Sequence, residues 1–301
     1  MNTKNKKPLV TIIINCFNGE KYLSKTIESI LKQKYNNYEV IFIDNCSTDN
    51  SKKIFKETKD SRFKYFKTKK KIKLYEARNF ALRKCKGKFI AFIDTDDWWE
   101  ENYLASRYKF YKSDKSYGFC YSNCFHYYES KKKFKVFWNT KMPSGFVLDK
   151  LLKNYFVKLG TIIVKKSLIS SLKFNPNYNI IGDYDFIIRS SQNYKGMGFQ
   201  DKLANIRIHQ NNFSHKNRAM FYKEFRYWLN EQNFNNKYFK KNKLILLQRL
   251  EYLRLINLIL NNKKFNLISD IFRINNLFLK IKLLFIFLIP SFLIKLRSKL
   301  L

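Results

Sequence analysis

The sequence predicts an α/β fold, with a mostly parallel sheet flanked by helices and a helical region at the C-terminal end. Over the first hundred residues, short apolar runs of strand length alternate with segments whose apolar residues recur at helical spacing. Such alternation produces a parallel sheet with helices on both faces. From about residue 216 the pattern is helical only. We therefore expect one α/β domain over residues 1–215 and a helical region over residues 216–301.

Each expected strand in the first part of the chain is a short run rich in β-branched and aromatic residues, as is typical of a buried strand. These strands cover residues 9–14, 38–43, 63–66 and 88–93. Three helices are expected between them. The first begins at an N-cap at Asn18, the second is capped by Thr48 or Asp49, and the third covers residues 75–84.

After Asp97 the pattern is looser, and the expected elements are shorter. They are a helix over residues 103–112, an antiparallel pair from 117–128 and 134–138, strands over 160–165 and 203–208, and a helix over 182–192. The five cysteines are an odd number in a large chain, so we expect no disulfide framework and a reducing compartment. Cys120 and Cys124 are interpreted as core residues, because their spacing to His126 does not match a zinc site.

The charge balance is extreme, with 60 basic and 23 acidic residues and a net charge of +37. A hydrophobic content of 45% excludes a disordered chain. The positive field favours anionic partners, but the sequence contains no recognised nucleic-acid module, so nucleic acid is not an expected partner. The basic start of the chain and the apolar run over residues 9–14 resemble a weak signal peptide without a cleavage site, and a buried strand is the preferred interpretation.

The last segment is apolar over residues 283–294, interrupted only by Pro290 and Ser291, and it has basic residues on both sides. A spanning helix needs about 20 apolar residues, so this run is too short. Basic flanks attract anionic lipid. We expect the tail to insert into one leaflet of a membrane; burial against the helical region is the alternative.

Three carboxylates follow the expected strand over residues 88–93: Asp94, Asp96 and Asp97. Carboxylates this close repel one another unless a cation compensates them. Magnesium usually shares its shell between one or two carboxylates and the phosphates of a substrate. The motif predicts a metal that holds a phosphorylated ligand at the carboxyl end of a strand. The alternative is an acidic turn in which Asp97 caps the next helix.

The second strand also ends in polar residues, of which Asp44 and Asp49 can accept hydrogen bonds from a base or a ribose hydroxyl. Residues 15–18, at the end of the first strand, are expected in the same crevice. The chain has no glycine-rich phosphate loop, so phosphates must be held another way. A metal on the aspartate cluster, helped by Arg78, would serve. Asp49 has the alternative role of a helix cap.

Six stretches of the chain, in this order and spacing, resemble family 2 glycosyltransferases. They are residues 10–19, 44–49, 76–79, 87–97, 182–185 and 207–209. The resemblance covers roughly residues 8–215. It implies the GT-A fold, a Rossmann-like arrangement that binds nucleotide sugars.

The resemblance also implies roles for single residues. It implies a general base at Asp183, and alternatively Asp183 and Asp185 are acids that favour a helix start. Contacts to the nucleotide sugar are implied for Asn15, Phe17, Asn18, Asp44, Asp49, Arg78, Asp94 and Thr95. Ligation of Mn²⁺ or Mg²⁺ is implied for Asp94, Asp96, Asp97 and His209. The alternatives are a solvated Arg78 and an ordinary buried His209.

The chain departs from the family pattern at two places. Family members often carry Glu where this chain has Gly182, directly before the implied base. They also tend to carry Gly near Lys73, ahead of the stretch at residues 76–79. The first departure bears on how Asp183 is oriented, and the second on the approach to the diphosphate.

The expected function is that of a metal-dependent, inverting glycosyltransferase, of the hexosyl- or N-acetylhexosaminyltransferase type. It would move a sugar from a nucleotide-diphospho-sugar, UDP-linked by preference, to a hydroxyl of a cell-surface glycan or lipid-linked acceptor. The expected location is cytoplasmic and peripheral, on the anionic inner face of the membrane. One alternative is a nucleotidyltransferase, although residues 15–19 lack its glycine-rich basic loop. Another is a membrane- or nucleic-acid-binding protein on a degenerate transferase fold, with steeply salt-dependent binding.

Overall fold

The structure is a computed structural model that describes residues 9–261, 267–274 and 277–288. The expected insertion of residues 289–294 and the basic segment before residue 9 lie outside these residues. The chain divides into two compact units. The first contains residues up to 148 together with 155–207, and the second contains residues 149–154 and those from 208 onward.

A seven-stranded sheet forms the centre of the first unit, in the order β10-β6-β9-β4-β1-β2-β3. Strands β1 to β4 are parallel, and β9 runs antiparallel to β4 and β6. The strands are β1 Val10–Cys16, β2 Tyr38–Asp44, β3 Phe63–Lys67, β4 Phe89–Asp94, β6 Tyr117–Ser122, β9 Ile163–Lys165 and β10 Lys195–Phe199. This mostly parallel sheet confirms the predicted fold class.

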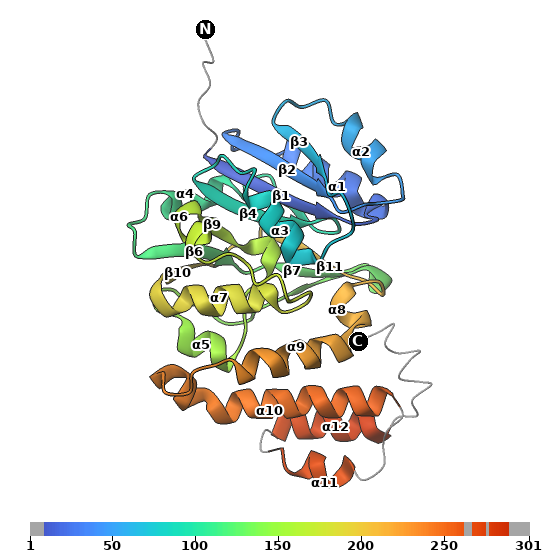
Figure 1. Ribbon diagram of the computed structural model, residues 1–301, viewed down its shortest axis with the longest axis vertical. Helices are drawn as coiled ribbons and strands as arrows, with labels where there is room; N and C mark the ends of the chain where they lie inside the picture. Colours follow the sequence, from blue (N-terminus) through green and yellow to red (C-terminus); the bar gives the residue numbers. More distant parts are fainter. Residues whose placement is uncertain (1–8, 262–266, 275–276, 289–301) are drawn as a thin grey trace. The chain divides into compact units, whose positions relative to one another are not determined.

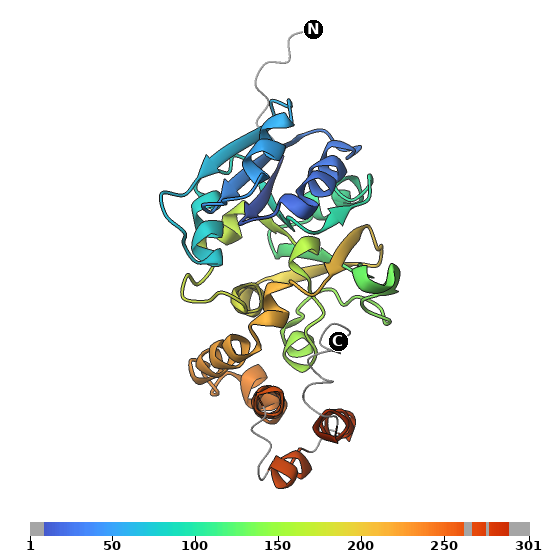
Figure 2. The ribbon, with the colours of Figure 1, turned by 90° about the vertical axis from the view of Figure 1, so that its right-hand side faces the viewer.

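Helices cover both faces of this sheet. They include α1 Glu20–Leu31, α2 Ser51–Glu57, α3 Leu74–Leu82 and α7 Gly182–Asn193. Figure 2 shows α1 on one face of the parallel strands and α3 on the other. Every residue of β2 is buried, as are all but one of β1. Strands buried on both faces have the continuous apolar runs from which the sheet was predicted.

A second sheet of four short strands, in the order β5-β11-β7-β8, lies in the same part of the chain. These are β5 Trp98–Trp99, β7 Phe125–Tyr128, β8 Lys133–Val136 and β11 Ala204–Ile208. The pairing of β7 with β8 confirms one half of the expected antiparallel pair. The other half is wrong, because β6 joins the large sheet. The buried Asn123 divides the run: its N–H donates to Phe199 O (3.1 Å) and its side chain donates to Trp138 O (2.7 Å).

The remaining elements of the first unit are short. They are the 3₁₀ turns η1 Ala105–Arg107, η2 Glu129–Lys131 and η3 Leu159–Thr161, and the helices α4 Tyr108–Tyr111 and α6 Lys166–Ser171. The helix expected over residues 103–112 is therefore shorter than predicted, and the strand expected over 160–165 begins only at Ile163. Cys120 and Cys124 are fully buried, as expected, and the described cysteines are all free.

The second unit is helical, as predicted from residue 216 onward. Its helices are α5 Leu148–Lys153, whose first residue belongs to the other unit, α8 Phe213–Lys216, α9 Arg218–Asn230, α10 Lys237–Leu260, α11 Leu267–Phe272 and α12 Leu277–Leu288. Helices α10, α11 and α12 (Figure 1) share one core. Its buried residues include Leu255 of α10, Ile271 of α11 and Leu283 of α12. Asn242 of α10 donates to Asp149 of α5 (2.9 Å).

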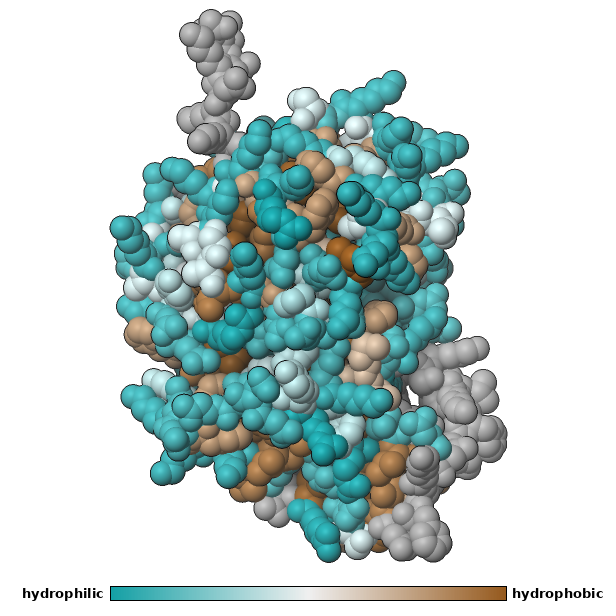
Figure 3. Space-filling view, viewed as in Figure 1, coloured by the Kyte–Doolittle hydropathy of each residue, from teal (hydrophilic) through white to brown (hydrophobic). Residues whose placement is uncertain are grey.

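One face of α12 is apolar and exposed. Leu277, Ile281, Phe285 and Leu288 have exposed fractions of 67%, 58%, 60% and 77%. Their spacing of three or four residues puts them on one side of the helix, while Leu283 and Ile286 face the core. In Figure 3 brown, hydrophobic atoms lie among teal ones toward the bottom of the view. Within the described ranges, no helix combines the length and apolarity needed to cross a bilayer.

Candidate active site

Three strand ends meet at one edge of the large sheet. Strand β1 lies between β2 and β4, with Cys16 opposite Asp44 and Asn15 opposite Asp94 (Figure 1). The parallel register therefore brings together the polar residues that follow these strands. This is the edge at which open α/β sheets bind ligands.

The loop after β1 and the loop after β2 are joined by hydrogen bonds. The Thr48 N–H donates to Asn18 Oδ1 (2.8 Å), and the Asn18 N–H donates to Ser47 Oγ (3.1 Å). Asn18 has a positive φ of 54°, a conformation that Asn tolerates better than most residues. The predicted N-cap at Asn18 is wrong, because α1 begins one residue later, after Gly19.

Asp49, which lies in the neighbouring loop after β2, caps α1 in place of Asn18. Its Oδ2 accepts from the Glu20 N–H (2.9 Å), and its Oδ1 accepts from the Ser51 N–H (3.0 Å). Burial raises the pKa of the Asp49 carboxyl, but the hydrogen bonds from Ser51 and Glu20 outweigh this and hold it below its ordinary value. The N-cap of α2 is Asn50, not Thr48 or Asp49 as predicted. The capping role for Asp49 is thus present, and both of its oxygens are engaged.

Asp44 is buried at the end of β2. Its Oδ1 accepts from the Ser47 N–H (2.7 Å), and its Oδ2 accepts from the hydroxyl of Tyr65. Nearby, the Asn15 side-chain amide nitrogen is buried and donates to no atom of the described chain. Phe17 is 44% exposed, and the ammonium of Lys71 lies 3.5 Å from its ring centroid. The crevice thus offers a buried amide, a carboxylate and an exposed ring.

The aspartate turn follows β4. The Arg78 guanidinium on α3 donates to Asp94 Oδ1 (3.0 Å), and Arg78 is only 3% exposed, so it is no solvated helix residue. Burial raises the pKa of the Asp94 carboxyl; Arg78 opposes this shift and the Asp96 charge adds to it. Thr95 and Asp96 are half-buried. Burial thus outweighs the salt bridge with Arg78, so the charged form of Asp94 is poorly compensated.

Asp97 is buried below this turn. Its Oδ1 accepts from the backbone N–H of Arg207 (2.9 Å), and burial, with Asp96 and Asp94, raises its pKa well above the ordinary value. Residues 98–99 form strand β5, so the alternative in which Asp97 caps a following helix is wrong. Asp94 and Asp96 are the more accessible members of the cluster.

Two basic residues of this region, Arg207 and Lys158, were not predicted as site residues from the sequence. Arg207 clamps the turn, since its Nε donates to Asp96 O (3.0 Å) while its N–H binds Asp97. The stretch at residues 207–209 is the one sequence feature that points to it. Lys158 lies over the ring of Phe137 (4.7 Å), and burial lowers the pKa of its ammonium. No sequence pattern indicates Lys158, because it reaches the site from a separate loop.

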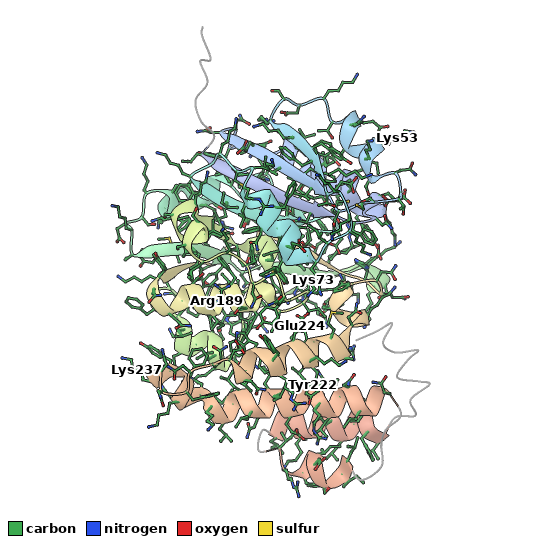
Figure 4. All side chains as sticks on the ribbon, in the orientation of Figure 1. Lys53, Lys73, Arg189, Tyr222, Glu224 and Lys237 are labelled. Carbon is green, nitrogen blue, oxygen red and sulfur yellow. The ribbon has the colours of Figure 1, made fainter. Side chains whose placement is uncertain are left out.

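Asp183 lies in the first turn of α7. The Tyr75 hydroxyl of α3 is 3.2 Å from Asp183 Oδ1, which also accepts from the Tyr184 N–H (2.8 Å). Asp185, two residues on, is buried and pairs with Arg189 (2.7 Å), a residue labelled in Figure 4 on α7. The two acids therefore differ. Asp185 stabilises its own helix, whereas the described residues that contact the Asp183 carboxylate, one of them on α3, do so at Oδ1.

His209 belongs to the second unit, as the second residue of the segment that begins at Ile208. Its Nδ1 accepts from the Asn211 N–H (3.1 Å), and its own N–H donates to Asn212 Oδ1 (2.6 Å). The part of the chain that the structure describes contains no cluster of three or more acidic, histidine or cysteine side chains close enough to enclose a metal. A role for His209 as a ligand stays a prediction.

The aspartate turn fits a hard divalent ion of the kind that substrate phosphates help to hold. Asp94 and Asp96 offer carboxylate oxygens, and a cation would oppose both the burial and the neighbouring negative charges that raise the pKa of Asp94. Magnesium and similar ions are commonly bound by one or two carboxylates, with water and phosphate in the other positions.

A comparison with protein families gives a clear match. The model of glycosyl transferase family 2 matches residues 11–172. Among curated relatives, the UDP-Glc:alpha-D-GlcNAc-diphosphoundecaprenol beta-1,3-glucosyltransferase WfaP of Escherichia coli is 32% identical over 166 residues. The match covers 55% of this chain and 64% of that enzyme's length.

Solved structures share the fold at low identity. TarS of S. aureus, in complex with UDP-GlcNAc, has a TM-score of 0.62 and 16% identity, and the match covers 81% of each chain. The mannosyltransferase PcManGT from Pyrobaculum calidifontis, in complex with GDP-Man and Mn²⁺, has a TM-score of 0.58 and 15% identity. That match covers 82% of this chain and 72% of the mannosyltransferase. Both likenesses show a common fold.

Proposed function

This chain belongs to glycosyl transferase family 2, and from that premise we propose that it transfers a sugar from a nucleotide-diphospho-sugar to a glycan or lipid-linked acceptor. One observation carries the proposal. The buried Asp44, the Asp94–Asp96 turn and Asp183 lie in one unit, around a single sheet edge. UDP is the proposed nucleotide, supported by the UDP-Glc in the name of WfaP and by the UDP-GlcNAc bound to TarS. Residues 1–215 are the proposed catalytic domain.

The donor would bind across the ends of β1 and β2. Asp44 offers its carboxylate to a base or ribose, the exposed Phe17 ring offers a stacking surface, and the unpartnered amide of Asn15 offers a donor. Arg78 and Lys158 supply positive charge against the diphosphate. A divalent ion held by Asp94 and Asp96 would neutralise the diphosphate leaving group as a Lewis acid.

Asp183 is the proposed general base. Its Oδ2 accepts no hydrogen bond from the described residues, so this oxygen is available to an acceptor hydroxyl. It would take the hydroxyl proton as the acceptor oxygen attacks the anomeric carbon from the side opposite the diphosphate. The carbon–oxygen bond to the diphosphate breaks as the new one forms, and the configuration inverts.

The donor class is testable by thermal denaturation. We expect one of UDP, GDP, CDP and dTDP to raise the midpoint in the presence of Mn²⁺. A ligand at 100 times its Kd adds about 2.7 kcal/mol, which in a chain of 301 residues is roughly 4 °C. Asp96→Asn should reduce the metal-dependent part, while Glu57→Gln, an exposed acid on α2, should not. A midpoint unmoved by all four nucleotides, with or without metal, contradicts the proposal.

We also propose that the exposed apolar face of α12 lies on an anionic membrane surface. The helix carries Lys280 and Lys282 and no acidic residue, so its charge suits anionic lipid. Ile268 and Phe272 of α11 add exposed apolar surface, with exposed fractions of 51% and 58%. A lipid-linked acceptor would be met at such a surface, and the cytoplasmic leaflet is the proposed location.

This second proposal predicts a loss of vesicle binding in Ile281→Glu/Phe285→Glu. Each buried apolar side chain contributes about 1.5–3 kcal/mol, so binding to phosphatidylglycerol vesicles should fall by at least tenfold. Cosedimentation measures this directly. The matched control is Leu31→Glu/Val136→Glu, two exposed apolar residues of the other unit. Equal binding by both double variants, or equal binding to neutral phosphatidylcholine, contradicts the proposal.

A further inference from the structure

Tyr75 is a buried residue of α3 whose hydroxyl reaches the start of α7. The residue is 2% exposed, and its oxygen lies 3.0 Å from Ile180 O and 3.2 Å from Asp183 Oδ1. The hydroxyl has one proton to share between these two acceptors; Ile180 O is the nearer atom, while the negative charge of the Asp183 carboxylate favours Oδ1. Burial raises the pKa of Tyr75 well above its ordinary value, so the group stays a donor.

Gly182 makes room for this ring. A Cβ at position 182 would lie 2.4 Å from Cδ2 and 2.5 Å from Cε2 of Tyr75. The space beside the proposed base, which a side chain at position 182 would otherwise take, is therefore filled by Tyr75. This gives a physical reason for the glycine at a position where family members often carry Glu.

The segment before α7 is tied to α3 at further points. Asn79 donates to Phe174 O (2.8 Å) and accepts from the Phe174 N–H (3.1 Å). Lys73, labelled in Figure 4 at the start of α3, donates to Asn177 O (3.3 Å). Because α3 is anchored on both sides of Tyr75, the hydroxyl has a fixed position relative to Asp183.

We infer that Tyr75 is a positioning residue for Asp183. Its hydroxyl and the Tyr184 N–H both bind Oδ1, and they leave Oδ2 as the oxygen that meets the acceptor hydroxyl. The inference rests on the proposed function, since it assumes that Asp183 is the general base. Tyr75 of α3 therefore helps to orient the base. Gly182 has no side chain and cannot do so in this chain.

A double-mutant cycle tests the inference, with Tyr75→Phe, Asp183→Asn and the combined variant. The substrates are UDP-glucose and a GlcNAc-diphospho-lipid, with Mn²⁺ present. Removing a hydrogen bond to a charged group costs roughly tenfold in rate, so Tyr75→Phe should lower kcat about tenfold. KM for UDP-glucose should be unchanged. In the Asp183→Asn background the same substitution should lower kcat by less than twofold, because the oriented carboxylate is already lost.

The outcomes separate the inference from the proposed function. If Asp183→Asn is as active as the wild type, or the wild type transfers no sugar, the proposed function fails. If Asp183→Asn is inactive but Tyr75→Phe keeps its full kcat, or loses tenfold in both backgrounds, the inference alone fails. Gly182→Ala is a second route, because its Cβ must displace the ring; it should lower kcat in the wild type and have little further effect in Tyr75→Phe. A further large loss in that background overturns the inference.

Discussion

Asp183→Asn is expected to lower kcat for sugar transfer by roughly 10²–10⁴-fold, the range that general base catalysis contributes. Asn has nearly the same shape and can keep the hydrogen bond from the Tyr184 N–H (2.8 Å) at its oxygen. It loses the basic Oδ2. Donor binding should therefore survive, so the midpoint shift with nucleotide and Mn²⁺ should equal that of the wild type. The measurement is kcat at saturating donor, alongside the thermal shift.

Two controls give this prediction its meaning. Glu57→Gln removes an exposed carboxylate from α2 and should leave kcat within twofold. Asp185→Asn breaks the buried pair with Arg189, so it should lower the unfolding midpoint more than Asp183→Asn does. If Asp183→Asn retains more than a tenth of the wild-type kcat, proton removal by this residue is not the main catalytic term. A lower unfolding midpoint without a lower kcat would indicate that Asp183 only stabilises the start of α7.

The parts of this site that the sequence predicts are those in which short patterns carry the information. A buried strand followed by acids places Asp44 and Asp94 at one sheet edge, because parallel strands end together. The order of the motifs adds Asp183, which lies far along the chain. The register of the strands and the hydrogen bonds between the first two loops place these loops side by side.

The parts that it does not predict depend on contacts between distant residues. Tyr75 and Asp183 are 108 positions apart, and no local pattern marks a tyrosine as the partner of an acid. The run at residues 117–128 is mostly apolar and aromatic, and the polar pair Ser122-Asn123 within it does not show that the two halves join different sheets. The caps of α1 and α2 differ from prediction because Asp49 caps α1 from another loop, a choice that only tertiary packing makes.

The largest effect on stability is expected for Asp201→Ala. Arg107 is fully buried, and its guanidinium donates to Asp201 through two parallel bonds of 2.7 and 2.8 Å. Tyr103 and Phe199 lie against the guanidinium at 4.5 and 4.6 Å, so these rings limit the access of water to the charge after the carboxylate is lost. Removing one partner of a buried pair leaves an uncompensated charge and costs about 3–5 kcal/mol. Proteins have about 5–15 kcal/mol in total, so denaturation by urea should show a large loss.

Asp60→Ala is the matched control, since the Arg62 guanidinium also binds both carboxylate oxygens of its aspartate but lies nearer the surface. The side chains of Arg62 and Asp60 are 28% and 21% exposed, against 0% and 27% for Arg107 and Asp201. Water can solvate Arg62 after the substitution, so its cost should be about 1 kcal/mol. Replacing both partners, as Arg107→Met/Asp201→Ala, removes the buried charge and should recover most of the loss. If Asp201→Ala lowers the unfolding free energy no more than Asp60→Ala does, then that free energy does not depend on burial of the Arg107 charge. Packing of the Arg107 side chain against Tyr103 and Phe199 would then account for its place in the core.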